Sequence, residues 1–148
     1  MCLTKPYRAL SKGSLMSPDA PLGAAMIHAA LLMLMAVALA MLVIRRRQEA
    51  KVGLGDGDDK ALARAIRVHA NFVEYAPFAV ASYILLALGG VSALFIHALG
   101  SVFLIGRVAH AAGLGQHEGA SLGRLIGAVA SNFVLLAAAL RLLAVALG

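Results

Sequence analysis

The chain has 148 residues, of which 61% are hydrophobic and only 14% are charged, and its mean hydropathy is +0.88. This composition excludes a water-soluble protein and indicates one integral membrane domain. The formal net charge of +6 would suggest nucleic-acid binding in a soluble protein, but here the basic residues flank apolar segments, where anionic headgroups attract them. We therefore expect membrane lipids, and no nucleic acid, as partners.

Residues 1–20 precede the first apolar segment. They lack an apolar run and contain Pro6 and Pro18, so we expect a disordered N-terminal extension, or translation upstream of a true start at Met16. The membrane domain is expected over residues 21–148. The only cysteine is Cys2, and no His-Glu-x-x-His motif occurs, so neither a disulfide framework nor a metal site is predicted.

The first predicted membrane span starts at residue 22. Residues 22–44 are apolar except for His28, long enough to cross a ~30 Å hydrocarbon core at about 1.5 Å per residue. Three arginines, residues 45–47, then end the segment. A cleaved signal peptide would have an apolar region of only ~7–15 residues, so an uncleaved span is the better interpretation.

Three further apolar segments follow, and the predicted spans are residues 22–46, 61–88, 91–114 and 121–147. Because backbone amides find no water in lipid, spanning segments are helices or closed barrels, and these runs lack the alternation of barrel strands. The sequence therefore predicts an all-α fold, an integral membrane four-helix bundle.

Basic residues are distributed unevenly between the two sides of this bundle. One side carries nine of the 13 Lys and Arg residues: Arg45, Arg46, Arg47, Lys51, Lys60, Arg64, Arg67, Arg107 and Arg124. The other side carries Lys5, Arg8, Lys12 and Arg141. By the positive-inside rule, the loops rich in basic residues are cytoplasmic and both termini lie outside.

Polar side chains lie along one face of the second predicted span. A helix turns ~100° per residue, so five polar residues fall within an arc of roughly 100°, and we call them the polar stripe: Arg64, Arg67, Asn71, Glu74 and Tyr75. His69 points to nearly the opposite side, and Pro77 is expected to kink the helix just beyond the stripe. Each ionisable group in a span costs roughly 2.5–3.5 kcal/mol on insertion scales, so such groups usually pair or bind a ligand.

Two interpretations of this stripe remain open. Glu74 could pair with Arg67 or an arginine of another helix and lock the bundle. Alternatively, the surplus of arginines around one carboxylate could bind an amino-acid-like or peptide ligand, with carboxylates for the arginines and an amine for Glu74. Arg107 and His110 form a second polar row at i, i+3 on the third span, and Arg124 opens the fourth.

These motifs resemble the MAPEG superfamily, the membrane-associated proteins in eicosanoid and glutathione metabolism. The resemblance is carried by Arg67-x-x-x-Asn71-x-x-Glu74-Tyr75-x-Pro77 on the second span, Arg107-x-x-His110 on the third and Arg124 on the fourth, and it extends over residues 22–147. The run Lys51-Val-Gly-Leu-Gly-Asp-Gly57 is similar to that of small uncharacterised bacterial members. Their location would be the bacterial inner membrane.

The resemblance implies a homotrimer of four-helix subunits that binds glutathione, as a co-substrate, between subunits in the cytoplasmic half of the membrane. It implies that Arg67 holds a carboxylate, that Asn71 and Glu74 bind the polar backbone and amino group, and that Tyr75 donates a hydroxyl. His69 would reach a site shared with the adjacent subunit. The full predicted glutathione-binding set is Arg64, Arg67, His69, Asn71, Glu74, Tyr75, Arg107 and His110.

The resemblance also assigns a catalytic residue, Arg124, which matches the family arginine near the glutathione sulfur. A cation there would stabilise the thiolate, the nucleophilic form. The implied function is a glutathione transferase, or a glutathione-dependent peroxidase acting on lipid hydroperoxides, whose hydrophobic substrate enters from the lipid. Leu114 departs from the pattern, because several members carry a tyrosine there. The alternative is a non-enzymatic transport or assembly subunit with a structural Arg/Glu network.

Overall fold

The computed structural model describes residues 12–116 and 121–148. This part of the chain forms four long helices, α2 (Pro21–Ala50), α3 (Lys60–Leu88), α4 (Ala93–Gln116) and α5 (Leu122–Leu147), preceded by the short α1 (Lys12–Leu15). All four long helices are long and apolar enough to cross a membrane. The predicted all-α, integral membrane four-helix bundle is confirmed.

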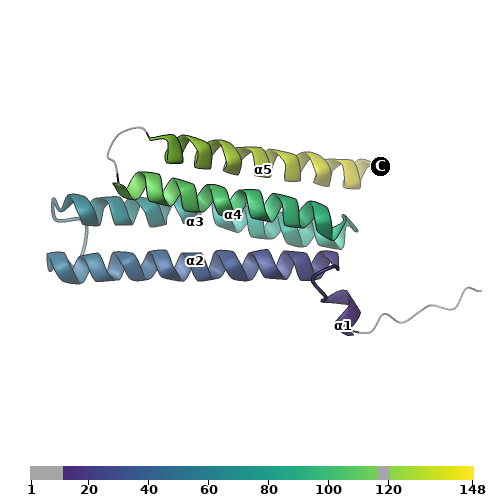
Figure 1. Cartoon of the computed structure of the whole chain (residues 1–148), viewed down its shortest axis with the longest axis horizontal. Helices are drawn as coiled ribbons and strands as arrows, with labels where there is room; N and C mark the ends of the chain where they lie inside the picture. The colour runs from purple at the N-terminus through teal and green to yellow at the C-terminus, as the bar shows by residue number, and fades with distance from the viewer. Residues whose placement is uncertain (1–11, 117–120) are drawn as a thin grey trace, which may run out of the picture.

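The four long helices run side by side along one axis (Figure 1). Helices α3 and α4 lie between α2 and α5, which do not contact each other in the described part of the chain. The C-terminal ends of α2 and α4 and the N-terminal ends of α3 and α5 share one end of the bundle, which we call the basic end. The opposite end, called the far end, holds the start of α2 and the C-terminus (Figure 1).

Helix α2 extends beyond its predicted end at residue 46 to Ala50. Glu49 explains this, because it accepts hydrogen bonds from Arg45 and Arg46 at 2.8 Å each, at helical i, i+4 and i, i+3 spacings. Lys51 then ends the helix in the left-handed conformation, with φ of 55°.

Helix α3 begins at an N-cap, where the side chain of Asp59 accepts a hydrogen bond from the Leu62 amide at 2.7 Å. The helix continues through Pro77, which has no backbone N–H to donate to the carbonyl four residues earlier. It ends at Gly89, and Gly90 supplies the positive φ of 73° for the turn into α4.

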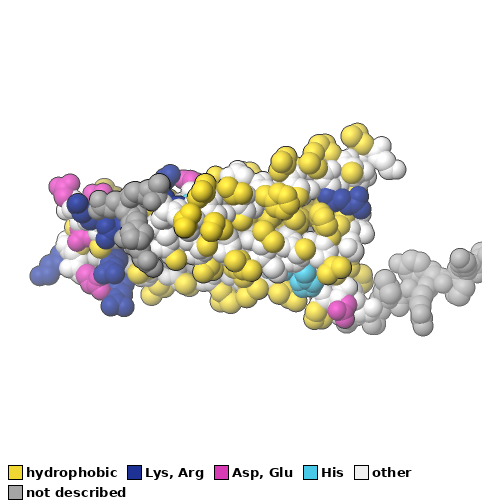
Figure 2. Space-filling view, turned by 45° about the horizontal axis from the view of Figure 1, so that its top comes forward, with side chains coloured by type: hydrophobic (Ala, Val, Ile, Leu, Met, Phe, Trp, Pro, Cys, Tyr) yellow, Lys and Arg dark blue, Asp and Glu magenta, His cyan; other side chains and the backbone are white. Residues whose placement is uncertain are grey.

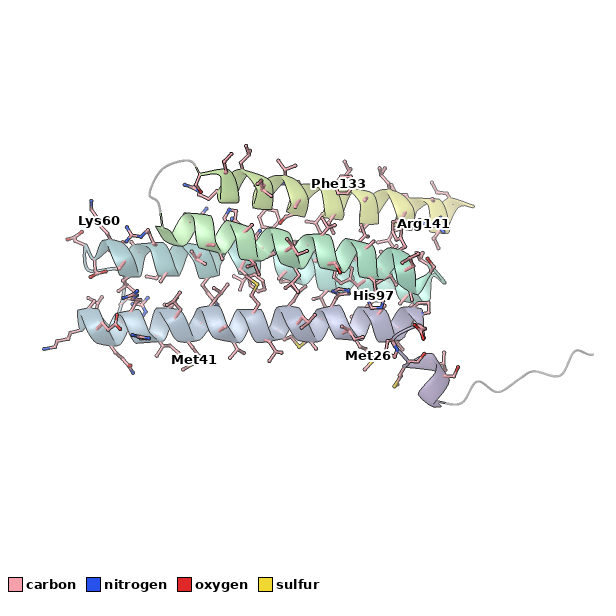
Figure 3. The ribbon with its side chains drawn as sticks, in the orientation of Figure 1. Met26, Met41, Lys60, His97, Phe133 and Arg141 are labelled. Carbon is pink, nitrogen blue, oxygen red and sulfur yellow. The ribbon has the colours of Figure 1, made fainter. Side chains whose placement is uncertain are left out.

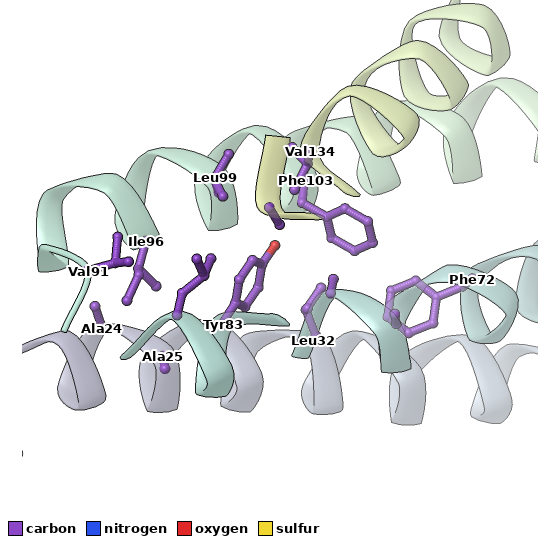
Figure 4. Packing of buried hydrophobic residues seen from close by; sticks show 14 residues of the cluster. Ala24, Ala25, Leu32, Phe72, Tyr83, Val91, Ile96, Leu99, Phe103 and Val134 are labelled. Carbon is purple, nitrogen blue, oxygen red and sulfur yellow. The ribbon is translucent and has the colours of Figure 1, made fainter. Parts of the chain in front are cut away.

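The core is built from alanines and a few large side chains. Tyr83 and Phe103 have no exposed surface, and they lie among Leu32, Phe72 and Val134 (Figure 4). Small residues allow helices in a membrane to approach closely, because packing there depends on van der Waals contact. The outer surface is an apolar band between the two ends (Figure 2), as a lipid-exposed surface requires.

Two histidines join helices at the far end. His28 of α2 and His97 of α4 are connected through Nε2 and Nδ1 at 3.2 Å, and His97 Nε2 donates to the Pro18 carbonyl at 3.0 Å. A carbonyl only accepts, so His97 carries its proton on Nε2 and accepts from His28 at Nδ1. Figure 3 places His97 on the side of α4 that faces α2.

Residues 12–20, the end of the predicted disordered extension, contain α1 and a turn in which the Ala20 amide donates to the Ser17 carbonyl at 2.9 Å. The His97 contact holds this turn against α4. The remainder of the predicted extension, residues 1–11, lies outside the described residues.

We predict that Gly100→Ala destabilises the bundle by about 1–3 kcal/mol, the usual cost of overpacking. Gly100 is buried, and an added Cβ would overlap the His28 ring, which its hydrogen bond to His97 holds in place. The measurement is thermal or denaturant unfolding in detergent.

Gly115→Ala is the matched control in the same helix, because a Cβ there meets no atom within 4 Å. It should leave stability unchanged or raise it slightly. Equal unfolding midpoints for Gly100→Ala and the wild type would contradict the packing described here.

Candidate functional site

Charged side chains concentrate at the basic end of the bundle. Figure 2 shows Lys, Arg, Asp and Glu gathered there and a long apolar surface beyond them. Figure 3 shows Lys60 at this end and Arg141 at the far end. The polar stripe of α3 begins at the basic end and extends toward the middle of the bundle, so its inner members lie at the border between the charged and apolar regions.

Arg107 of α4 is the most deeply buried charge in the described part of the chain, with 2% of its surface exposed. Its Nη2 donates to Asn71 Oδ1 of α3 at 2.6 Å, and its Nη1 donates to the Ser131 hydroxyl of α5 at 3.3 Å. The guanidinium also lies over the Tyr75 ring, 5.3 Å from its centroid. One side chain therefore joins three helices.

The Asn71 amide continues this network toward the surface. Because its oxygen accepts from Arg107, its Nδ2 is directed toward Glu74 Oε2, at 3.5 Å. The other Glu74 oxygen lies 3.4 Å from Arg67 Nη1. The side chains of Arg67 and Glu74 are 63% and 49% exposed, so this pair is open, whereas the Arg107–Asn71 contact is shorter and part-buried.

Two hollows flank this network at the basic end. One has a volume of about 370 Å³ and is lined by Lys60, Ala63, Arg64, Arg67 and Leu114. The other has a volume of about 340 Å³ and is lined by His110, Ser121, Arg124, Leu125 and Ala128. Each hollow thus combines at least one cationic side chain with apolar walls.

Helix α5 approaches α4 closely beside His110. A Cβ on Gly127 would overlap the Gly106 carbonyl and His110 Cβ, so only glycine allows this approach. The Gly127 carbonyl accepts from the Ser131 hydroxyl at 2.8 Å, which orients that hydroxyl oxygen toward Arg107. This close approach packs His110 against α5, where it is 7% exposed and its Nδ1 has no hydrogen-bond partner within the described residues.

The N-cap of α5 determines where Arg124 lies. Ser121 caps α5 by accepting a hydrogen bond from the Arg124 amide at 3.4 Å, so Arg124 sits in the first turn, beside His110 across the second hollow. Arg124, which the resemblance places near a reacting sulfur, therefore shares one hollow with His110, a member of the predicted glutathione-binding set.

The structure brings most of the predicted site residues together. Arg67, Asn71, Glu74, Tyr75 and Arg107 form one network, Arg64 lines a hollow beside Arg67, and His110 and Arg124 line the other hollow. His69 is half-buried, and no hydrogen bond or ion pair joins it to these residues in the described part of the chain. The predicted opposite facing of His69 agrees with this separation.

Sequence reasoning missed Ser131. A signal for it existed, since Gly127 and Ser131 are spaced i, i+4 in an otherwise apolar segment, and serine in a membrane helix commonly bonds to the carbonyl one turn earlier. What the sequence did not indicate is that Ser131 faces Arg107 rather than lipid.

Comparisons with known proteins agree with these motifs. The family model described as "MAPEG family" matches residues 25–144. The chain is 38% identical over 55 residues to "Inner membrane protein YecN" of Escherichia coli strain K12, and equally to the protein of that name from E. coli O6:H1. That alignment covers 37% of this chain and 42% of those relatives. No solved structure is significantly similar to this chain. Because the family model covers most of the chain and all four spans, this protein belongs to the MAPEG family.

Proposed function

We propose that this protein binds glutathione at the basic end and uses it as a transferase or peroxidase toward hydrophobic substrates. The observation that carries the proposal is the open Arg67–Glu74 pair beside the fixed Asn71 amide. These three groups match a zwitterionic peptide: a guanidinium for a carboxylate, a carboxylate for an amino group and an amide for a peptide bond.

Arg107 has a positioning role in this proposal. Its side chain is 2% exposed and already donates to Asn71 and Ser131. It therefore holds Asn71 rather than touching the ligand, and it fixes which end of the amide faces outward. The surrounding cations Arg64 and Arg67 supply the positive charge that a ligand with two carboxylates requires.

The sulfur would lie in the hollow that Arg124 and His110 share. A cation beside a thiol lowers its pKa and raises the fraction of the nucleophilic thiolate. The thiolate would attack an electrophilic carbon and form a C–S bond, while a leaving group departs with its bonding electrons or, in an addition, the neighbouring atom takes up a proton. Alternatively, it would attack the terminal peroxide oxygen and break the O–O bond, which gives a glutathione sulfenic acid and an alkoxide that leaves as the alcohol once protonated. The thiol of a second glutathione would then displace the sulfenic hydroxyl, giving the disulfide and water.

The acceptor is inferred to be hydrophobic because the surface beyond the site is apolar. On α5, Leu125 and Val129 are 61% and 60% exposed, and Leu125 also lines the Arg124 hollow. A lipophilic molecule could thus reach the sulfur along this helix from the membrane.

We further propose that subunits assemble as a homotrimer in the inner membrane, with the basic end toward the cytoplasm. The distribution of Lys and Arg supports this orientation, and the relatives named inner membrane proteins support the location. Arg67 and Glu74 are half-exposed in one subunit, and a neighbouring subunit would cover them.

The first test of this proposal is stabilisation by glutathione. A ligand present at 100 times its dissociation constant stabilises the folded state by about 2.7 kcal/mol. We expect Arg67→Gln and Glu74→Gln each to weaken binding by roughly 10–100-fold, because each removes a charge-assisted hydrogen bond worth ~1.5–3 kcal/mol. The unfolding midpoint in detergent is measured against glutathione concentration.

Arg141→Gln is the control, since it removes the same charge at the far end and should respond to glutathione like the wild type. Absence of any stabilisation at millimolar glutathione would overturn the proposal. It would leave a structural role for the Asn71–Arg107–Ser131 network, which joins three helices.

The second test concerns Arg124. We expect Arg124→Ala to retain glutathione binding but to lose the ultraviolet absorbance of the bound thiolate at neutral pH, with thiolate appearing only as the pH approaches about 8.5, the pKa of a free thiol. Arg124→Lys should recover part of the signal because it restores a cation. A thiolate signal in Arg124→Ala equal to that of the wild type would assign sulfur activation to another residue.

A further inference from the structure

A third cavity opens at the basic end, separate from the Asn71–Glu74 network. It has a volume of about 240 Å³ and lies between α2, α3 and α4. Arg46 of α2 and Arg64 of α3 line it together with apolar side chains, among them Leu39, Leu42 and Ala111. Two cations from different helices thus lie beside an apolar wall.

The position of this cavity along α2 indicates its surroundings. Leu39 and Leu42 belong to the apolar run that ends at residue 44, and Arg46 follows immediately. The cavity therefore lies where the apolar core of the membrane meets its headgroups. A ligand there would meet hydrocarbon on one side and water on the other.

Glu49, the carboxylate nearest in sequence to Arg46, does not balance the positive charge of its arginine partners. Glu49 accepts from both Arg45 and Arg46 at 2.8 Å, so one negative charge serves two positive ones. Exposed pairs of this kind contribute only about 0–1 kcal/mol, and Arg46 retains further N–H donors for another anion. No carboxylate lines the cavity itself among the described residues.

We propose that this cavity binds the headgroup of an anionic phospholipid. The phosphate would accept hydrogen bonds from Arg46 and Arg64, and the glycerol and upper acyl chain would pack on Leu39 and Leu42. The volume is below the roughly 300–1,000 Å³ of cavities that enclose small molecules, so most of the lipid would remain in the membrane.

Glutathione does not suit this cavity. The described residues that line the cavity include no carboxylate for the amino group of glutathione, and most of them are apolar. Free phosphate would leave that apolar wall without a partner. Arg64 also lines the hollow beside Arg67, so a bound lipid would hold a cation at the edge of the glutathione site. The lipid proposal does not depend on the proposed function.

The experiment uses the full chain in nanodiscs of phosphatidylcholine with increasing phosphatidylglycerol. Native mass spectrometry after transfer to detergent counts the lipids retained, and the unfolding midpoint is followed in parallel. We expect the wild type to retain phosphatidylglycerol over phosphatidylcholine, and Arg46→Gln and Arg64→Gln each to lower this preference roughly fivefold.

Arg45→Gln is the matched control for Arg46→Gln. Arg45 is on the same helix, also contacts Glu49 and is 76% exposed, but it does not line the cavity. Ala111→Leu tests the apolar wall, because it fills the cavity without changing charge and should also reduce retention. Lipid retention is measured without glutathione, so its outcome is separate from that of the proposed function.

Three results would overturn the proposal. An equal loss of lipid in Arg45→Gln and Arg46→Gln would mean that only the overall surface charge attracts lipid. Unchanged retention in Ala111→Leu would show that the cavity is not occupied. Displacement of phosphatidylglycerol by inorganic phosphate alone would indicate an anion site that does not recognise lipid. If Arg64→Gln does not fold, the comparison of Arg46→Gln with Arg45→Gln decides the question.

Discussion

The buried guanidinium of Arg107 is the constraint on which the rest of the site depends. A charge with 2% exposure inside an apolar bundle needs hydrogen-bond acceptors, and Asn71 and Ser131 accept from its Nη2 and Nη1 on two different helices. Its Nε has no hydrogen-bond partner among the described residues. The need for acceptors fixes how α3, α4 and α5 rotate relative to one another. It also explains why α5 carries Gly127, since the Ser131 hydroxyl reaches Arg107 only where α5 lies close to α4.

The network also divides the polar residues into those that hold the site and those that remain available. Arg107, Ser131 and the Oδ1 atom of Asn71 are occupied with one another. By contrast, Asn71 Nδ2 is directed toward Glu74, and the Arg67–Glu74 pair is at 3.4 Å and half-exposed. An open pair of this kind contributes little to folding. In a membrane protein, ionised groups with this exposure need water, headgroups, a ligand or another subunit as a partner. The proposed peptide ligand and the proposed trimer both meet that need.

Much of the fold could be predicted from the sequence because apolar length and basic flanks determine membrane spans directly. The stripe on α3 was also predictable, since a single helix fixes which of its residues share a face. The contact between Asn71 and Arg107 was not predictable from the sequence, because helical periodicity does not determine how one helix rotates against another. The contact of Ser131 with Arg107 and the His28–His97 pair were not predictable for the same reason.

Leu114 stands where several family members carry a tyrosine, and its position shows which part of the site lacks that hydroxyl. It is 7% exposed and lines the hollow with Arg64 and Arg67, whereas Arg124 lines the hollow with His110. The hydroxyl absent at Leu114 would therefore have belonged to the side of the site that holds carboxylates in the proposal. Sulfur activation would depend instead on Arg124, with His110 as the remaining polar group beside it. The substitution at Leu114 is thus compatible with thiolate chemistry, because the apolar residue and the proposed reacting atom occupy different hollows.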